Sequence, residues 1–232
     1  MIKFNSLQDE IELFSANEEL GVRIEKFADQ KIAIVDNFYK HPDKIRELAQ
    51  LIPATRSPVI LHALPGSRVE ATYHLSHLGY IFTDIINNVF AEDMENVEET
   101  FIQNCINRST FLVNIQNSNL PIRVPHIDNP GAGRWAVGIF LNTPEDCVGG
   151  TAFYKYKGNT TADIKQLMTD AEAAQYTHYV QESDGKNWEK IHMAEMKFNR
   201  MIIYRQSALH TPYIPPNTFT DENPRMIQMI FI

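Results

Sequence analysis

Two residues with metal-binding side chains, His126 and Asp128, lie two positions apart in the segment RVPHIDNPGAGRW. In an extended strand, residues i and i+2 point to the same face, so this imidazole and this carboxylate would face one cavity. The pattern alone is weak, because the chain has eight histidines and Asp is a common residue. Asp-Asn-Pro-Gly is also typical of a turn, in which Asp128 would bond only to the backbone.

His210 is the third residue that we expect in this site. It follows the apolar run RMIIYRQSAL and precedes TPYIPP, where prolines end the strand. Two imidazoles and one carboxylate on one face of the ion form the ligand set of non-haem Fe(II) sites, which keep other positions open for a co-substrate and O₂. His126, Asp128 and His210 therefore predict a metal site. Weaker candidates are His41, His74, His77, His178 and His192.

Arg225 stands fifteen residues after His210, at the start of the last apolar run, RMIQMIFI. A guanidinium can bind a carboxylate through two parallel hydrogen bonds. We therefore expect Arg225 to hold the distal carboxylate of a dicarboxylic co-substrate. The alternative is an exposed cation on an edge strand.

The segments around these residues are typical of short strands. The runs are aromatic or β-branched and are separated by Asn, Pro and Gly. They cover residues 110–118, 134–142, 150–157, 188–198, 199–206 and 225–232. Nearer the N-terminus, we predict a strand at 30–36 and two helices, at 41–52 with Pro42 in the first turn and at 73–92 with an apolar face.

The order of these elements predicts an α+β, mainly β fold with helices packed on one face of a β-sandwich or barrel. We expect one domain over residues 1–232. Residues 1–100 would form a helical buttress with the first strands, and residues 101–232 would form the β core. A helical insertion is expected at about 161–181, with Thr161 as its N-cap. Residues 55–73 read as an irregular segment and a candidate lid.

Composition excludes several classes of protein. The chain has 232 residues, a net charge of −8 and no Lys/Arg-rich run, so we expect neither nucleic acid nor a membrane surface as a partner. It has no run of 18 apolar residues and no N-terminal segment like a signal peptide, which favours a cytoplasmic protein. Cys105 and Cys147 lie far apart and outside any zinc-type spacing, so we expect reduced thiols.

Taken together, His126-Ile127-Asp128, His210 and Arg225 resemble the pattern of the 2-oxoglutarate/Fe(II)-dependent dioxygenases. GGTAFY, residues 149–154, resembles the Gly-Gly segment of these enzymes, and NRMIIYRQSALHTPY resembles the strand-turn-strand that delivers the distal His. More narrowly, VPHIDN, GIFLN and GGTAFYKYKG, with DNFYKHPDKIRELA upstream, are similar to a DUF6445-type branch of this superfamily. The resemblance covers most of residues 31–232.

The resemblance implies a double-stranded β-helix, or jelly roll, with N-terminal helices against one sheet. It implies Fe(II) held by His126, Asp128 and His210, and 2-oxoglutarate that binds the iron and reaches Arg225. O₂ would be the oxidant, and the substrate would be a small molecule, an amino acid or a peptide. Because related halogenases lack the carboxylate ligand, Asp128 favours hydroxylation or another plain oxidation.

The chain departs from the family pattern two residues after Arg225. Many relatives have Ser, Thr or Asn there, whereas this chain has Ile227. A second hydrogen bond to 2-oxoglutarate must then come from another residue, and the candidates are Asn114, Gln116, Thr151 and Tyr154. Asn114 and Gln116 also fit a solvated sheet face, and Tyr154 also fits a core aromatic.

Other residues have weaker assignments. Arg134 and Trp135 follow the first two ligands closely and would border the cavity mouth, although Trp135 also suits a core position. Arg68 and Arg123 would attract an acidic substrate, although a surface position is the commoner outcome for Arg.

Two competing functions remain open from the sequence. The first is a non-enzymatic jelly roll that binds a sugar or another small ligand, in which the His and Asp residues need not converge. The second is a cupin-like metalloenzyme that does not use 2-oxoglutarate, in which Arg225 would have no special role.

Overall fold

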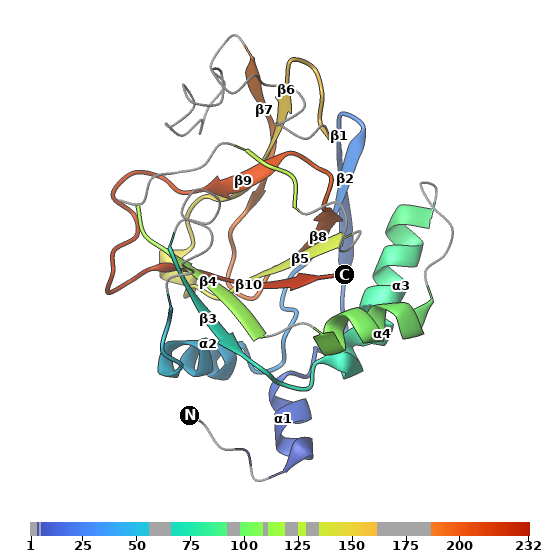
Figure 1. Ribbon diagram of the computed structural model, residues 1–232, viewed down its shortest axis with the longest axis vertical. Coiled ribbons are helices and arrows are strands. Elements are labelled where there is room, and N and C mark those ends of the chain that lie inside the picture. The colour runs from blue at the N-terminus through green and yellow to red at the C-terminus, as the bar shows by residue number, and fades with distance from the viewer. Residues whose placement is uncertain are drawn as a thin grey trace.

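The computed structural model describes residues 4, 6–55, 66–91, 98–108, 111–118, 125–128, 135–161 and 187–232. This part of the chain is mainly β, with two antiparallel sheets and a few helices (Figure 1). The seven-stranded sheet has the order β1-β2-β8-β5-β10-β4-β3, and the three-stranded sheet has the order β7-β6-β9. The predicted α+β, mainly β class is therefore confirmed.

The strands of the large sheet are β1 (Val22–Phe27), β2 (Gln30–Val35), β3 (Ser67–Ala71), β4 (Phe111–Gln116), β5 (Trp135–Phe140), β8 (Met201–Arg205) and β10 (Arg225–Phe231). Those of the small sheet are β6 (Gly150–Tyr156), β7 (Trp188–Glu195) and β9 (His210–Tyr213). The α-helices are α1 (Leu7–Leu13), α2 (Pro42–Leu51), α3 (Gly79–Phe90) and α4 (Glu99–Arg108), and short 3₁₀ turns cover Ser76–Leu78 and Pro144–Asp146.

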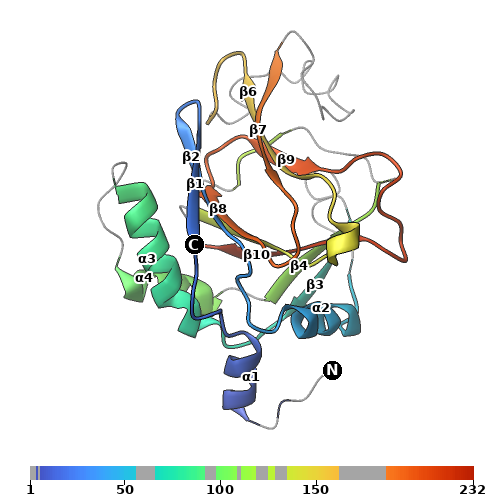
Figure 2. The same ribbon diagram turned by 180° about the vertical axis from the view of Figure 1, so that it is seen from behind.

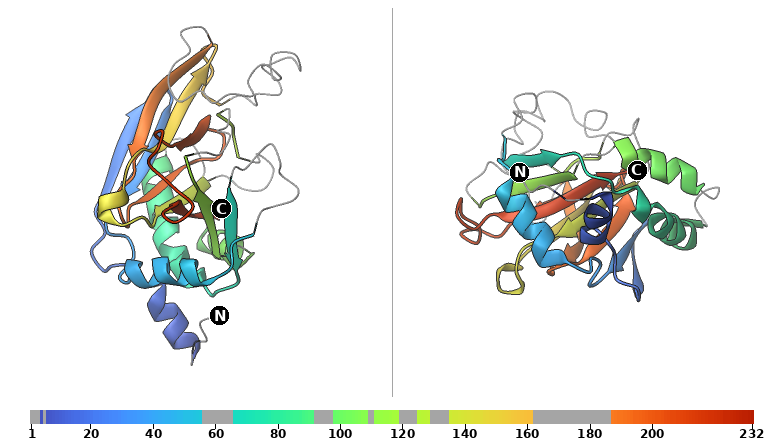
Figure 3. Two further views of the ribbon diagram at one scale, coloured as in Figure 1. Left: turned by 90° about the vertical axis from the view of Figure 1, so that its left-hand side faces the viewer. Right: turned by 90° about the horizontal axis from the view of Figure 1, so that it is seen from below.

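The large sheet separates two hydrophobic cores, because side chains alternate between its faces. On β5, Trp135 and Val137 pack into the core that the helices cover. Ala136 and Phe140 of the same strand belong to the other core, which also contains Phe153 of the small sheet. Figures 1 and 2 show β6 and β7 at one end of the molecule and α1 and α2 at the other, and the side view in Figure 3 shows the same separation.

Most predicted strands are present, but several elements differ from the sequence-based expectation. Residues 67–71 of the candidate lid form β3, an ordinary strand paired with β4, so the lid prediction is wrong for these residues; residues 56–65 lie outside the described part. The helix predicted at 73–92 begins only at Ser76, as a 3₁₀ turn that leads into α3. The predicted insertion at about 161–181 lies outside the described residues, except for Thr161.

The N-terminal part of the chain belongs to the same sheet as the C-terminal part. β2 pairs with β8, and β3 pairs with β4. The strands before residue 100 therefore extend the β core rather than forming a separate unit. No helix in the described residues is long and apolar enough to cross a membrane. Cys105 and Cys147 are free thiols.

Gly149 precedes β6 and has a left-handed backbone, with φ +73°. A Cβ at this position would lie 2.2 Å from the carbonyl oxygen of Tyr213 and 2.9 Å from Cδ of Pro215. We expect Gly149→Ala to lower the free energy of unfolding by about 2–4 kcal/mol, because the left-handed conformation costs about 1–2 kcal/mol and the clash adds to it. Chemical denaturation measures the change. Gly21→Ala is the control, since nothing lies within 4 Å of its Cβ position, and an equal loss in both variants would contradict the expectation.

Asp36 joins β2 to the segment before β8. Its carboxylate accepts hydrogen bonds from Arg200 Nε (2.6 Å), Arg200 Nη2 (3.2 Å) and Lys197 Nζ (2.9 Å). These bonds, that of Arg200 foremost, lower the pKa of Asp36 to about 2. Because the pKa is lowered in the folded state, the stabilisation is complete above the unfolded pKa of about 3.9 and is lost as pH falls through 2.

We therefore expect Asp36→Asn to lower the free energy of unfolding near neutral pH by about 1–2 kcal/mol, the range for charge-assisted bonds at a partly exposed site. The difference from the wild type should shrink as pH falls from 4 to 2. Urea denaturation over this pH range measures it. The control is Glu19→Gln, which removes an exposed carboxylate. A difference between wild type and Asp36→Asn that does not depend on pH would contradict the assignment.

Candidate metal centre

Backbone hydrogen bonds hold the segment 125–128 beside the start of β9. His126 and His210 form an antiparallel bridge, in which each amide donates to the carbonyl of the other at 2.9 Å. The Asp128 amide donates to the Gln206 carbonyl, also at 2.9 Å. Two histidines that are distant in the sequence are thereby fixed side by side through their main chains.

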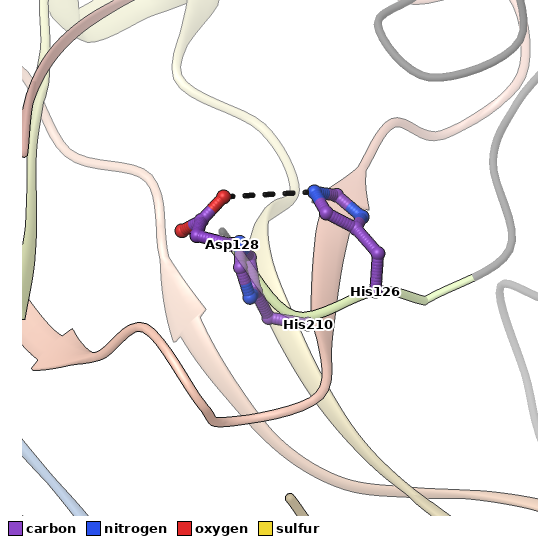
Figure 4. A group of neighbouring side chains, drawn as sticks. All are labelled: His126, Asp128 and His210. Atoms are coloured by element: carbon purple, nitrogen blue, oxygen red, sulfur yellow. Dashed lines mark ion pairs between the residues drawn. The ribbon is translucent and has the colours of Figure 1, made fainter. Parts of the chain in front are cut away.

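The side chains of His126, Asp128 and His210 converge (Figure 4). His126 Nε2 lies 3.8 Å from Asp128 Oδ1, and His210 Nε2 lies 3.5 Å from Asp128 Oδ2. One ligand atom from each residue lies within 4.8 Å of the other two. The two Asp128 separations are longer than ordinary hydrogen bonds. They fit atoms around a shared ion, since ligands with bonds of about 2.1 Å can lie up to roughly 4.2 Å apart.

A second contact orients His210. Its Nδ1 lies 2.9 Å from the carbonyl oxygen of Ala208. Since a carbonyl only accepts, Nδ1 is the donor, and in the neutral ring the lone pair then belongs to Nε2, the nitrogen that faces Asp128. Histidine ligands of metals commonly have such a partner on the remote nitrogen. The contact with Ala208 therefore orients the neutral ring of His210 so that Nε2 is the atom offered to a metal.

The three residues differ in exposure. The side chain of His210 is 6% exposed and that of Asp128 14%, whereas that of His126 is 31% exposed. The centre is thus closed on the side of β9 and opens to solvent at His126. This arrangement leaves one side of the cluster accessible to a small molecule.

The same pocket contains the three residues and Arg225. It measures about 60 Å³ and lies between the two sheets. Polar side chains that also line it are Arg68, Asn114, Gln116, Thr151 and Tyr204. Its apolar lining comes from Pro212, Ile227, Met229 and Phe231.

Arg225 lies at the deep end of this pocket and is 2% exposed. Its Nη1 donates to Gln116 Oε1 at 2.8 Å, and its Nη2 donates to the carbonyl of Gly150 at 3.2 Å. The guanidinium carbon also lies 5.7 Å from the centre of the Phe140 ring, within the range of a cation–π contact. These contacts fix the orientation of the guanidinium.

The sheet register explains why Asn114 and Gln116 face the pocket. Gln116 lies opposite Arg225, and Asn114 lies opposite Ile227, in the β4–β10 pair. Thr151 reaches the pocket from β6. Three of the four candidates for a second contact to the co-substrate are therefore in the pocket, and Gln116 already contacts Arg225.

Tyr154 is the candidate that the structure places elsewhere. It is buried on the other face of the small sheet, in a cluster with Tyr156 and Trp188. The β-bulge between Phe153 and Tyr154 interrupts the pairing of β6 with β7 at this point. Because Tyr154 is not among the described residues that line the pocket, the structure gives it no role in the site.

Other sequence-based assignments have clear outcomes. Trp135 packs in the core that the helices cover, which confirms its reading as a core residue and excludes a place at the cavity mouth. His192 lies away from the cluster, where it pairs with Glu25 at 3.0 Å and stacks on Phe27. Arg123 and Arg134 lie outside the described residues.

Tyr204 is a pocket residue that the sequence analysis missed. Its ring centre lies 4.7 Å from that of His210. Burial raises the pKa of Tyr204 well above its usual range, Asp128 raises it further, and Arg225 lowers it. The charges of Asp128 and Arg225 therefore both act on the Tyr204 hydroxyl, which stays protonated. The available signal was the alternation in RMIIYR, which places Ile202 and Tyr204 on the face opposite Ile203.

The protein is thus mainly β, and its His–Asp–His cluster, the candidate metal centre, lies between two antiparallel sheets. The chain matches DUF6445, a family of unknown function, over residues 19–226, and it belongs to this family. The match agrees with the resemblance to DUF6445 seen in the sequence and does not test the wider resemblance to the dioxygenases. No curated protein matches the chain, so the site itself must carry any functional assignment.

Proposed function

We propose that this protein is an Fe(II)- and 2-oxoglutarate-dependent oxygenase that hydroxylates a small molecule, an amino acid or a peptide. One observation carries the proposal: His126, Asp128, His210 and the buried Arg225 line the same pocket. Such an arrangement offers a metal ion and a carboxylate clamp to a single bound molecule. The resemblance noted in the sequence points to the same chemistry.

The donor set fits a ferrous ion. His126 and His210 would supply Nε2, and Asp128 would supply a carboxylate oxygen. This is the two-His, one-carboxylate set, which leaves coordination positions open. When bound, Fe(II) with 2-oxoglutarate supplies oxidation by O₂, in which 2-oxoglutarate becomes succinate and CO₂ while one oxygen atom goes to the substrate.

Arg225 would bind the distal carboxylate of 2-oxoglutarate. A carboxylate can form two parallel charge-assisted hydrogen bonds with a guanidinium, and in a buried site such a pair offsets the cost of burying both charges. Gln116 holds Nη1 at 2.8 Å and would keep the fork oriented while the co-substrate enters. The raised pKa of Tyr204 keeps its hydroxyl protonated, so Tyr204 and Thr151 are the hydroxyl donors available for the second contact.

The fold supports the proposal in its general form. The large and small antiparallel sheets face each other across the pocket, and the helices of the described residues pack on the other face of the large sheet. A double-stranded β-helix has this arrangement of two sheets around an internal site. The pocket of about 60 Å³ holds a few water molecules. A five-carbon co-substrate is larger than this volume, so part of it would lie in the open mouth of the pocket, where Phe231 is 37% exposed.

The test is anaerobic reconstitution with Fe(II), followed by addition of O₂, ascorbate and 2-oxoglutarate. We expect succinate to form only when Fe(II) and 2-oxoglutarate are both present, and we expect Zn(II) to replace iron without turnover because it has no redox chemistry. Oxidation that proceeds without 2-oxoglutarate would favour a cupin-like metalloenzyme. A chain that binds no metal would favour a ligand-binding jelly roll.

A further inference from the structure

We propose that Arg68 binds a carboxylate of the substrate, so that the substrate is an organic acid with an apolar body. This inference rests on the proposed function and adds a substrate class to it. Arg68 is the second guanidinium of the pocket, and the co-substrate needs only one of the two.

The register of three strands places Arg68 on the pocket face. Ile227 of β10 lies opposite Asn114 of β4, and Asn114 lies opposite Arg68 of β3. Residues opposite each other in paired strands share a face, and all three line the pocket. β3 is the last strand of the sheet. Arg68 therefore reaches the pocket from its rim, two strands away from the strand that carries Arg225.

The Arg68 guanidinium has no hydrogen-bond acceptor among the described residues. Its Nε is buried and makes no hydrogen bond. Burial lowers the pKa of Arg68, and the exposed Glu70, two residues along β3, raises it. An arginine stays protonated in spite of such a shift. A half-buried cation without an acceptor is costly, and an anion in the pocket would remove that cost.

The pocket also has an apolar wall. Ile227, Met229 and Phe231 alternate along β10 and all face the pocket. They extend from beside Arg225 at the deep end to the exposed Phe231 at the mouth. A molecule that contacts Arg68 through a carboxylate can rest the remainder of its surface on this wall.

The two guanidiniums differ in depth, which assigns them different ligands. Arg225 is held by Gln116 and Gly150 at the bottom of the pocket. Arg68 is only partly buried, on the edge strand. The molecule that enters first would occupy Arg225, and Arg68 would then remain for the second. Arg68 is thus a specificity-determining residue.

The test compares acids with their amides on the protein loaded with Zn(II) and saturating 2-oxoglutarate, so that Arg225 is occupied. The probes are phenylacetate with phenylacetamide and hexanoate with hexanamide, and ligand-observed NMR gives their dissociation constants. We expect each acid to bind roughly tenfold more tightly than its amide, as for a charge-assisted hydrogen bond. In Arg68→Gln the preference should fall below about twofold. Arg23→Gln removes an exposed arginine, and this control should keep the preference.

Two results would overturn the inference. One is a wild type that binds the acids no more tightly than the amides, a comparison that needs no variant. The other is a preference that persists in Arg68→Gln. Failure of the proposed function looks different, because the wild type would then fail to bind 2-oxoglutarate. The comparison of Arg68→Gln with wild type can still be made on that protein.

Discussion

Replacing His210 with alanine is expected to abolish Fe(II) binding and to lower 2-oxoglutarate turnover more than about 100-fold. Loss of a residue that only hydrogen-bonds a metal ligand already lowers metal affinity or activity about 10- to 100-fold, and loss of the ligand itself should have a larger effect. The backbone bridge between His210 and His126 does not use the side chain, so the local strand pairing should remain. Iron content after desalting and the rate of succinate formation measure the two effects.

His192→Ala is the matched control for this experiment. His192 also lies on the small sheet and is partly buried, but its partner is Glu25. This variant should retain iron and turnover. If His210→Ala kept its iron and its turnover, the metal centre would have to be abandoned, whatever the behaviour of Arg225.

The second large effect is expected at Arg225. Removing one partner of a buried ion pair costs about 3–5 kcal/mol. We therefore expect Arg225→Gln to weaken 2-oxoglutarate binding roughly 150- to 5000-fold and to leave Zn(II) binding intact. Arg225→Lys should lie between this variant and the wild type, because lysine keeps the charge without the two-pronged geometry. Calorimetric titration of the Zn(II)-loaded protein gives both affinities.

Arg46→Gln serves as the control for charge, since Arg46 lies on α2 and contacts Gln50. It should bind 2-oxoglutarate as the wild type does. An unchanged 2-oxoglutarate affinity in Arg225→Gln would argue for a metalloenzyme of another kind, in which Arg225 does not bind the co-substrate.

Local sequence patterns predicted those elements whose signal is local. Alternation in RMIQMIFI predicts a strand, and its period places Arg225 and Ile227 on one face. The apolar spacing in 41–52 and the position of Pro42 predict α2. α4 had a comparable signal, because Ile102, Cys105 and Ile106 are spaced for one helical face, but the sequence analysis overlooked it.

Elements that depend on distant partners were not predicted. β3 has the sequence SRVEA, in which only Val69 is buried. It is a strand because β4 pairs with it, and edge strands depend strongly on such context. For the same reason the sequence could suggest His210 as a ligand but could not place it. Its position follows from the bridge to His126, a pairing between residues far apart in the chain.

The alternation along β10 divides the consequences of mutation between neighbouring residues. Met226 and Ile230 point toward the helices, whereas Ile227 and Met229 point toward the pocket. Substitutions confined to Ile227, Met229 and Phe231 would therefore change the shape of the pocket and leave the core between the large sheet and the helices unchanged. Related proteins could therefore differ in the ligands they bind through substitutions in β10 alone, while the fold stayed the same.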